Sequence, residues 1–197
     1  MRFSNNEIKD LVIAGMLISL AFAILLSGGF KALITLSPAI LVAFLIAFFT
    51  AGAGFLLHEL MHKYVAQNYG LNAGFKAYYP GLWLALILSF FGFIIAAPGA
   101  VYISGFITRE RNGRISLAGP MTNIALAILF LIPSLFIKEG LLGVLFSYGF
   151  SINSLLALFN MIPAMPFDGA KVIAWNKVAY GITIAIALTL FILSLSI

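Results

Sequence analysis

ILVAFLIAFFTAGAGFLLHELMHKYV, residues 40–65, is an apolar stretch without proline that carries the pentapeptide HELMH at residues 58–62. A helix start signal precedes it at Ser37-Pro38, an N-cap residue followed by proline at the first helical position. At 1.5 Å per residue, His58 lies about 30 Å from Pro38, roughly one hydrocarbon thickness. The stretch therefore predicts a membrane-spanning helix with both histidines near its far end.

The rest of the chain is similarly apolar. Hydrophobic residues make up 63% of the 197 residues and charged residues only 9%, whereas soluble domains carry about a quarter charged residues. The net charge is +5, but the eleven Lys and Arg residues are scattered between apolar runs and form no basic face for nucleic acid. We expect one membrane domain over residues 1–197, with no appended soluble domain, a lipid bilayer around it and no nucleic-acid partner.

Further apolar runs predict the other helices. They cover residues 11–26, 120–137, 141–161 and 172–195, and a shorter run covers 82–97. Gly99–Thr108 is rich in β-branched and aromatic residues, and the turn Asn112-Gly113 precedes a second short segment at 114–117. The sequence therefore predicts an all-α polytopic membrane protein, a bundle of about five to six transmembrane helices with a re-entrant or short β-hairpin segment around 82–117.

His58 and His62 are the only histidines in the chain, and one helical turn separates them. Side chains at i and i+4 share a helix face, so the two imidazoles can bind one zinc ion, and Glu59 can take a proton from zinc-bound water. One alternative is a pair of hydrogen-bonded core histidines, and another is a proton or cation relay in a transporter. Ionisable residues at membrane depth are costly and usually functional, which disfavours the purely structural pair.

A zinc hydrolase needs three protein ligands and an open position for water. Since the chain has no cysteine and no third histidine, the third ligand must be a carboxylate. Asp168 follows Pro163 and Pro166, which interrupt backbone hydrogen bonding in the way that a cavity or metal site inside a membrane can accommodate. We expect Asp168 to be the third ligand, with capping of the last helix as the alternative. Three other carboxylates are interpreted as solvated charges: Asp10, Glu110 and Glu139.

Three motifs in this order resemble the site-2 protease family of intramembrane zinc metalloproteases: HELMH, GPMTN at Gly119–Asn123, and NMIPAMPFDG at Asn160–Gly169. The resemblance implies regulated cleavage of membrane-bound substrates within the bilayer, near the cytosolic face of a cell membrane. It implies that Asn123 and Asn160 support the site or the unwound substrate, with ordinary interhelical hydrogen bonding as the alternative. The residue roles that it implies are one zinc ion per chain on His58, His62 and Asp168, and Glu59 as general base.

The sequence thus predicts a zinc metalloendopeptidase that hydrolyses peptide bonds within or near the transmembrane segments of single-span membrane proteins. A substrate helix must unwind before attack, and Gly99–Thr108 is a candidate edge strand for the unwound chain, or else a plain structural strand. The alternative function is a metal-ion or proton transporter using the same polar residues. It is disfavoured because the histidines, Glu59 and Asp168 all map to one end of their helices.

The membrane topology follows from the need for His58 and Asp168 to meet. Both lie at the C-terminal ends of their spans, so the chain must cross the membrane an even number of times between Asn72 and Ser116. We therefore expect residues 82–97 to dip in and return, or to cross and be reversed by a re-entrant 99–108. With a cytosolic N-terminus, this topology leaves only Lys31 and Lys138 outside among the basic residues.

Overall fold

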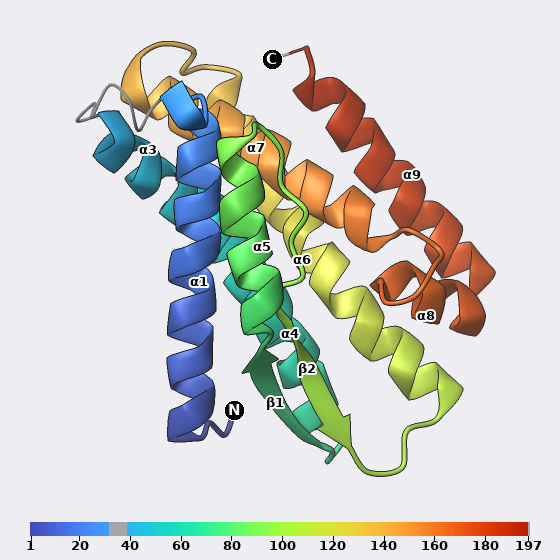
Figure 1. Ribbon diagram of the computed structural model, residues 1–197. Helices are drawn as coiled ribbons and strands as arrows, with labels where there is room; N and C mark the ends of the chain where they lie inside the picture. Colours follow the sequence, from blue (N-terminus) through green and yellow to red (C-terminus); the bar gives the residue numbers. More distant parts are fainter. Residues whose placement is uncertain (32–38, 197) are drawn as a thin grey trace. The chain divides into compact units, whose positions relative to one another are not determined.

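Helices dominate the computed structural model, which describes residues 1–31 and 39–196 (Figure 1). Five helical segments of the described residues are long and apolar enough to cross a membrane: Asn5–Leu26, Ala39–Asn68, Arg109–Ser134, Gly140–Asn160 and Lys177–Ser194. The fold class predicted from the sequence is therefore confirmed. The predicted start of the second span at Ser37-Pro38 lies outside the described residues.

The described elements follow one another with short connections. In chain order they are α1 (Asn5–Leu26), α3 (Ala39–Ala47), η1 (Phe48–Gly52), α4 (Ala53–Asn68), β1 (Asn72–Ala77), α5 (Tyr79–Phe90), β2 (Gly99–Ser104), α6 (Arg109–Ser134), α7 (Gly140–Asn160), α8 (Asp168–Trp175) and α9 (Lys177–Ser194). The second span is continuous through α3, η1 and α4, with a short π-helical section at η1. The π-helical section ends six residues before His58, so the histidines lie on regular α-helix.

The chain forms two compact units. The C-terminal unit comprises Leu57–Ala73 and Ile103–Ile197, and the N-terminal unit comprises Arg2–Leu56 and Gly74–Tyr102. The chain passes from one unit to the other inside α4 and inside each strand. The HELMH pentapeptide and the loop before α8 both belong to the C-terminal unit.

Helices α6, α7 and α9 of the C-terminal unit pack around one apolar cluster, and α8 lies beside α6 and α9 (Figure 1). The buried residues of the cluster are Ile124, Ala127, Phe150, Ala157, Ala187 and Leu190. Only 17% of the 18-residue helix α9 is buried, so most of its apolar surface faces outward. An exposed apolar surface of this extent is stable in contact with lipid rather than water.

In the N-terminal unit, α1 begins with a capping box. The Ser4 hydroxyl accepts the backbone N–H of Glu7, and the Glu7 carboxylate accepts the N–H of Ser4. Asp10 accepts the N–H of Ala77 at 3.0 Å and the hydroxyl of Tyr79 at 2.7 Å. Asp10 is partly exposed, in agreement with its interpretation as a solvated charge, and its carboxylate also holds the end of β1 and the start of α5.

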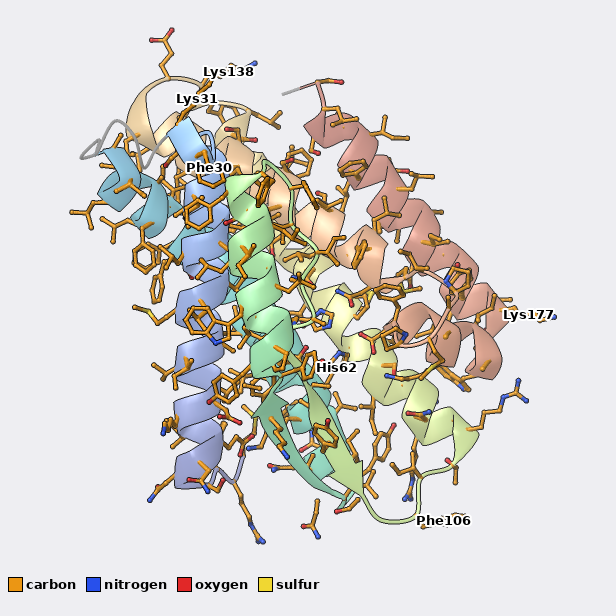
Figure 2. All side chains as sticks on the ribbon, in the orientation of Figure 1. Phe30, Lys31, His62, Phe106, Lys138 and Lys177 are labelled. Atoms are coloured by element: carbon orange, nitrogen blue, oxygen red, sulfur yellow. The ribbon has the colours of Figure 1, made fainter. Side chains whose placement is uncertain are left out.

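The segment after β1 enters the N-terminal unit as α5 and returns beside its own starting point. The N–H of Tyr78 donates to the carbonyl of Pro98 at 3.0 Å. At the far end, Phe91 meets the ring of Phe30, labelled in Figure 2, with ring centroids 5.5 Å apart. The twelve residues of α5 span about 18 Å, well short of a hydrocarbon core of about 30 Å. The structure thus has the re-entrant form of the two topologies that the sequence left open.

The extended segment expected after Pro98 is present as β2, but its partner is β1, and the two arrows run in opposite directions in Figure 1. The expected second strand at 114–117 is wrong, because those residues lie inside α6. Helix α6 starts at Arg109 rather than Pro120, since the hydroxyl of Thr108 accepts the N–H of Arg111 and caps the helix.

The predicted last helix, 172–195, is divided in two. Asn176 breaks it with an extended backbone, and the Asn176 carboxamide accepts the N–H groups of Val178 and Ala179. The short helix α8 precedes this break and begins at Asp168. The N-terminal residue of α8, Asp168, meets the HELMH helix.

Candidate metal centre

The two imidazoles of the HELMH helix and one carboxylate meet inside the C-terminal unit. The Nε2 atoms of His58 and His62 lie 3.0 Å apart, and a carboxylate oxygen of Asp168 lies 3.3 Å from the first and 3.0 Å from the second. All three residues are buried, and their possible ligand atoms lie within 4.8 Å of one another. Two nitrogens and one oxygen with this convergence form a group that could hold a metal ion.

The third member of this group is held by its surroundings. Asp168 is the first residue of α8, and the helix has no side-chain cap hydrogen bond from its N-cap residue Phe167. One oxygen of Asp168 faces the imidazoles, and the other lies 3.4 Å from the ammonium group of Lys171. The ammonium group of Lys171 favours the charged carboxylate, which is the form that a metal requires.

Both imidazoles are oriented by hydrogen bonds at the ring nitrogen that faces away from the carboxylate. His62 Nδ1 lies 2.8 Å from the backbone carbonyl of Ile115 on α6, and His58 Nδ1 lies 2.6 Å from the amide oxygen of Asn123. A carbonyl oxygen only accepts, so His62 carries its proton on Nδ1. In the neutral ring, Nε2 then carries the lone pair and points towards His58 and Asp168, and most metal-binding histidines donate their other ring N–H in this way.

Gly119 keeps open the space beside the imidazoles. A β-carbon at Gly119 would lie 2.5 Å from the Nε2 atoms of both His58 and His62. Helix α6 therefore passes close to the two nitrogens only because this position has no side chain. The donor set and the open space fit a zinc ion, which binds nitrogen and oxygen ligands and keeps one position for water in catalytic sites.

The other residues singled out from the sequence lie as follows. Glu59 is buried, next to His58 on α4. Asn123 bonds to His58, whereas the amide of Asn160 donates to the carbonyl of Leu156 in its own helix. Among the described residues, the candidate metal-binding group contains none of the three carboxylates interpreted as solvated: Asp10, Glu110 and Glu139. Glu110 forms an exposed ion pair with Arg114, in agreement with its interpretation.

Sequence reasoning missed one polar residue at this site, Asn153 of α7. Its side chain is completely buried, and its amide oxygen accepts a hydrogen bond from Asn123 at 3.1 Å. The available signal was an asparagine in the middle of an apolar span, because a buried amide without partners is costly.

The fold and the site together define a multi-pass membrane protein with a buried His-His-Asp group that could bind a metal ion. The chain is 45% identical over 184 residues to "Putative zinc metalloprotease MJ0611" of Methanocaldococcus jannaschii, covering 92% of this chain and 90% of that protein. It is 33% identical over 119 residues to "Zinc metalloprotease MJ0392" of the same organism, covering 60% of this chain and 30% of that protein. It is 29% identical over 140 residues to "Putative zinc metalloprotease YwhC" of Bacillus subtilis, covering 60% of this chain and 63% of that protein.

No family model and no solved structure matches the chain. The identity to the first relative nevertheless extends over nearly the whole of both proteins. The chain therefore belongs to the site-2 protease family of zinc metalloproteases, as the three sequence motifs indicated. Zinc is the metal that this membership implies.

Proposed function

We propose that this protein is an intramembrane metalloendopeptidase that cuts single-span membrane proteins within or near their transmembrane segments. The observation that carries the proposal is the convergence of His58, His62 and Asp168, with their possible ligand atoms within 4.8 Å of one another, inside an apolar helical unit. A site buried among membrane-spanning helices is suited to substrates that themselves lie in the membrane.

The roles of the side chains follow from their positions. His58, His62 and Asp168 would hold the zinc ion, which when bound supplies a Lewis acid and lowers the pKa of water towards 7. Glu59 would take the proton from the attacking water and return it to the leaving amine. Glu59 is next to His58 in the sequence, is buried, and does not belong to the group of three possible ligands.

Substrate binding would use the free edge of β2. A helical substrate hides its carbonyls in hydrogen bonds and must become extended before attack, and an extended chain can pair with the edge of a sheet. Among the described residues the sheet has two strands, so β2 has one strand neighbour. Its exposure alternates along the strand, and Tyr102 is 67% exposed. Segments with glycine, asparagine or proline unwind most easily and should be cut best.

Charge supports a site near the cytosolic face of the cell membrane. Helix α6 begins with Arg109, Arg111 and Arg114, and Gly119 beside the imidazoles lies five residues beyond the last of these, about 8 Å along the axis. Arginines at the end of a span favour the cytosolic side. Lys138, labelled in Figure 2, follows the other end of α6, away from the three arginines.

The proposal is tested with purified protein in lipid nanodiscs and a single-span substrate that carries glycine and asparagine in its span. Wild-type protein should cut inside the span, a zinc chelator should stop cleavage, and added zinc should restore it. Glu59→Gln should keep about one zinc per chain and lose cleavage by at least about 1,000-fold, whereas Glu110→Gln, the same change at an exposed site, should keep both.

Cleavage by Glu59→Gln at the wild-type rate would remove the proposed base, and cleavage insensitive to the chelator would remove the metal mechanism. The alternative transporter function predicts zinc uptake into sealed proteoliposomes above that of empty vesicles. The protease proposal predicts no zinc uptake. It also predicts that cleavage is equal in sealed proteoliposomes and in open nanodiscs.

A further inference from the structure

A line of buried hydrogen bonds leads from helix α7 to the metal centre. The amide nitrogen of Asn153 donates to the carbonyl of Gly149 at 2.9 Å. The amide nitrogen of Asn123 donates to the amide oxygen of Asn153 at 3.1 Å, and the amide oxygen of Asn123 lies 2.6 Å from His58 Nδ1. Asn123 and Asn153 are completely buried, so water does not compete for these bonds.

The donor and the acceptor of each of these hydrogen bonds are fixed, because the first acceptor is a backbone carbonyl. A backbone carbonyl only accepts, so Asn153 must turn its NH2 group towards Gly149 and its oxygen towards Asn123. Asn123 must then donate to Asn153 and turn its own oxygen towards His58. His58 Nδ1 therefore carries the proton, and its Nε2 lone pair is left for a metal.

We propose that Asn153 is a positioning residue that selects the metal-binding tautomer of His58 through the amide of Asn123. The proposal rests on the proposed role of His58 as a zinc ligand. Without Asn153, the NH2 group of Asn123 loses this acceptor, and a rotation of the amide by 180° would present that group to Nδ1. That arrangement is satisfied by the other tautomer, in which Nε2 carries the proton and cannot bind zinc.

His62 does not depend on this line. Its Nδ1 donates directly to the carbonyl of Ile115, which fixes its tautomer without an amide intermediate. Since the chain has two histidines, the loss of the tautomer control should affect one imidazole and spare the other. A general loosening of the bundle would disturb both.

Two substitutions at Asn153 separate tautomer control from packing. Asn153→Leu keeps the branching at Cγ, with a larger side chain, and removes both hydrogen bonds. Asn153→Asp, buried and therefore protonated, can donate its O–H to Gly149 and still accept from Asn123, so it keeps the direction of the line. A matched control is Ser154→Ala, because Ser154 is also completely buried on α7 and its hydroxyl donates to Phe150 of its own helix.

The experiment measures zinc affinity by competition with a chromophoric chelator, and ring-nitrogen NMR spectra of zinc-free protein labelled with ¹⁵N-histidine. Asn153→Leu should bind zinc about 10- to 100-fold more weakly, with altered His58 signals and unchanged His62 signals. Asn153→Asp and Ser154→Ala should stay within about threefold of the wild type and keep both signal patterns.

Unchanged zinc affinity in Asn153→Leu would overturn the proposal, and so would an equal loss in Asn153→Leu and Asn153→Asp. If the leucine variant does not fold, an aspartate variant that folds but binds zinc about 10-fold more weakly overturns the proposal as well. His58→Ala separates this failure from that of the proposed function. If His58→Ala binds zinc as tightly as the wild type, the ligand role of His58 is wrong. If His58→Ala loses zinc affinity but Asn153→Leu does not, only the tautomer control is wrong.

Discussion

Gly119 lies directly against His62, because a β-carbon at Gly119 would fall 2.5 Å from the Nε2 atom of that imidazole. Gly119→Ala should therefore displace the histidines or fill the metal position and weaken zinc binding by at least about 10-fold. Alanine is the better helix former by about 1 kcal/mol, so the helix itself should not be weakened. The measurement is zinc affinity by chelator competition, together with the thermal unfolding midpoint of the metal-free protein.

The control for this substitution is Gly181→Ala in α9, where an added β-carbon would meet nothing within 4 Å. It should leave zinc affinity unchanged. Equal zinc affinity in the Gly119 and Gly181 variants would show that the space beside the imidazoles is not the metal position.

Asp168→Ala should leave a two-histidine site that binds zinc far more weakly, by at least about 100-fold, and cuts no substrate. Glu110→Ala should change neither property, because Glu110 is exposed and its ion pair with Arg114 contributes at most about 1 kcal/mol. Zinc content after gel filtration compares the two variants. Loss of zinc from the Glu110 variant and not from the Asp168 variant would show that Asp168 is the wrong carboxylate.

The sidedness of α6 is testable because the natural chain has no cysteine. Glu110→Cys and Glu139→Cys place one exposed thiol near each end of the span. An impermeant maleimide added outside intact cells should label Glu139→Cys only, and Glu110→Cys should react after the membrane is opened. External labelling of Glu110→Cys would reverse the proposed topology.

Glu7 should contribute to stability beyond its helix cap. Its carboxylate is buried and accepts the N–H of Phe75 at 2.9 Å, 68 residues away in sequence. Glu7→Ala leaves that N–H without its acceptor and should cost about 1 to 3 kcal/mol. Ser4→Ala removes the cap alone and should cost about 1 kcal/mol. Unfolding in detergent compares the two, and equal losses would mean that the bond to Phe75 adds nothing.

The sequence predicted the spans and the three side chains that the structure brings together, and the reasons are physical. Helices in a membrane must be long and apolar, so each one is recognised in the sequence as a long apolar run. The histidines could be paired because helix geometry relates residues four apart. Asp168 could be found because the exclusion of cysteine and further histidines left few ligands, and the structure brings it to both imidazoles.

What sequence reasoning could not supply depends on contacts between segments distant in the chain. Strand β2 was located, but its partner β1 was missed, because the apolar pattern of residues 72–77 is weak. Pro120 was taken for a helix start, although the helix begins at Arg109 with Thr108 as its cap and continues through the proline. Asn153 has no motif around it, and only its bond to Asn123 connects it with the site.

The pairing of Glu7 and Asp10 with β1 also limits how the protein can meet other copies of itself. The N–H groups of Phe75 and Ala77 point to the same side of β1. The carboxylates of Glu7 and Asp10 accept one hydrogen bond from each of them. A sheet polymerises when every strand can accept a neighbour on each side. Here one side is already occupied by the first helix, so β1 of one molecule cannot pair with β2 of the next. This occupied side guards a crowded membrane against the growth of a continuous sheet from molecule to molecule.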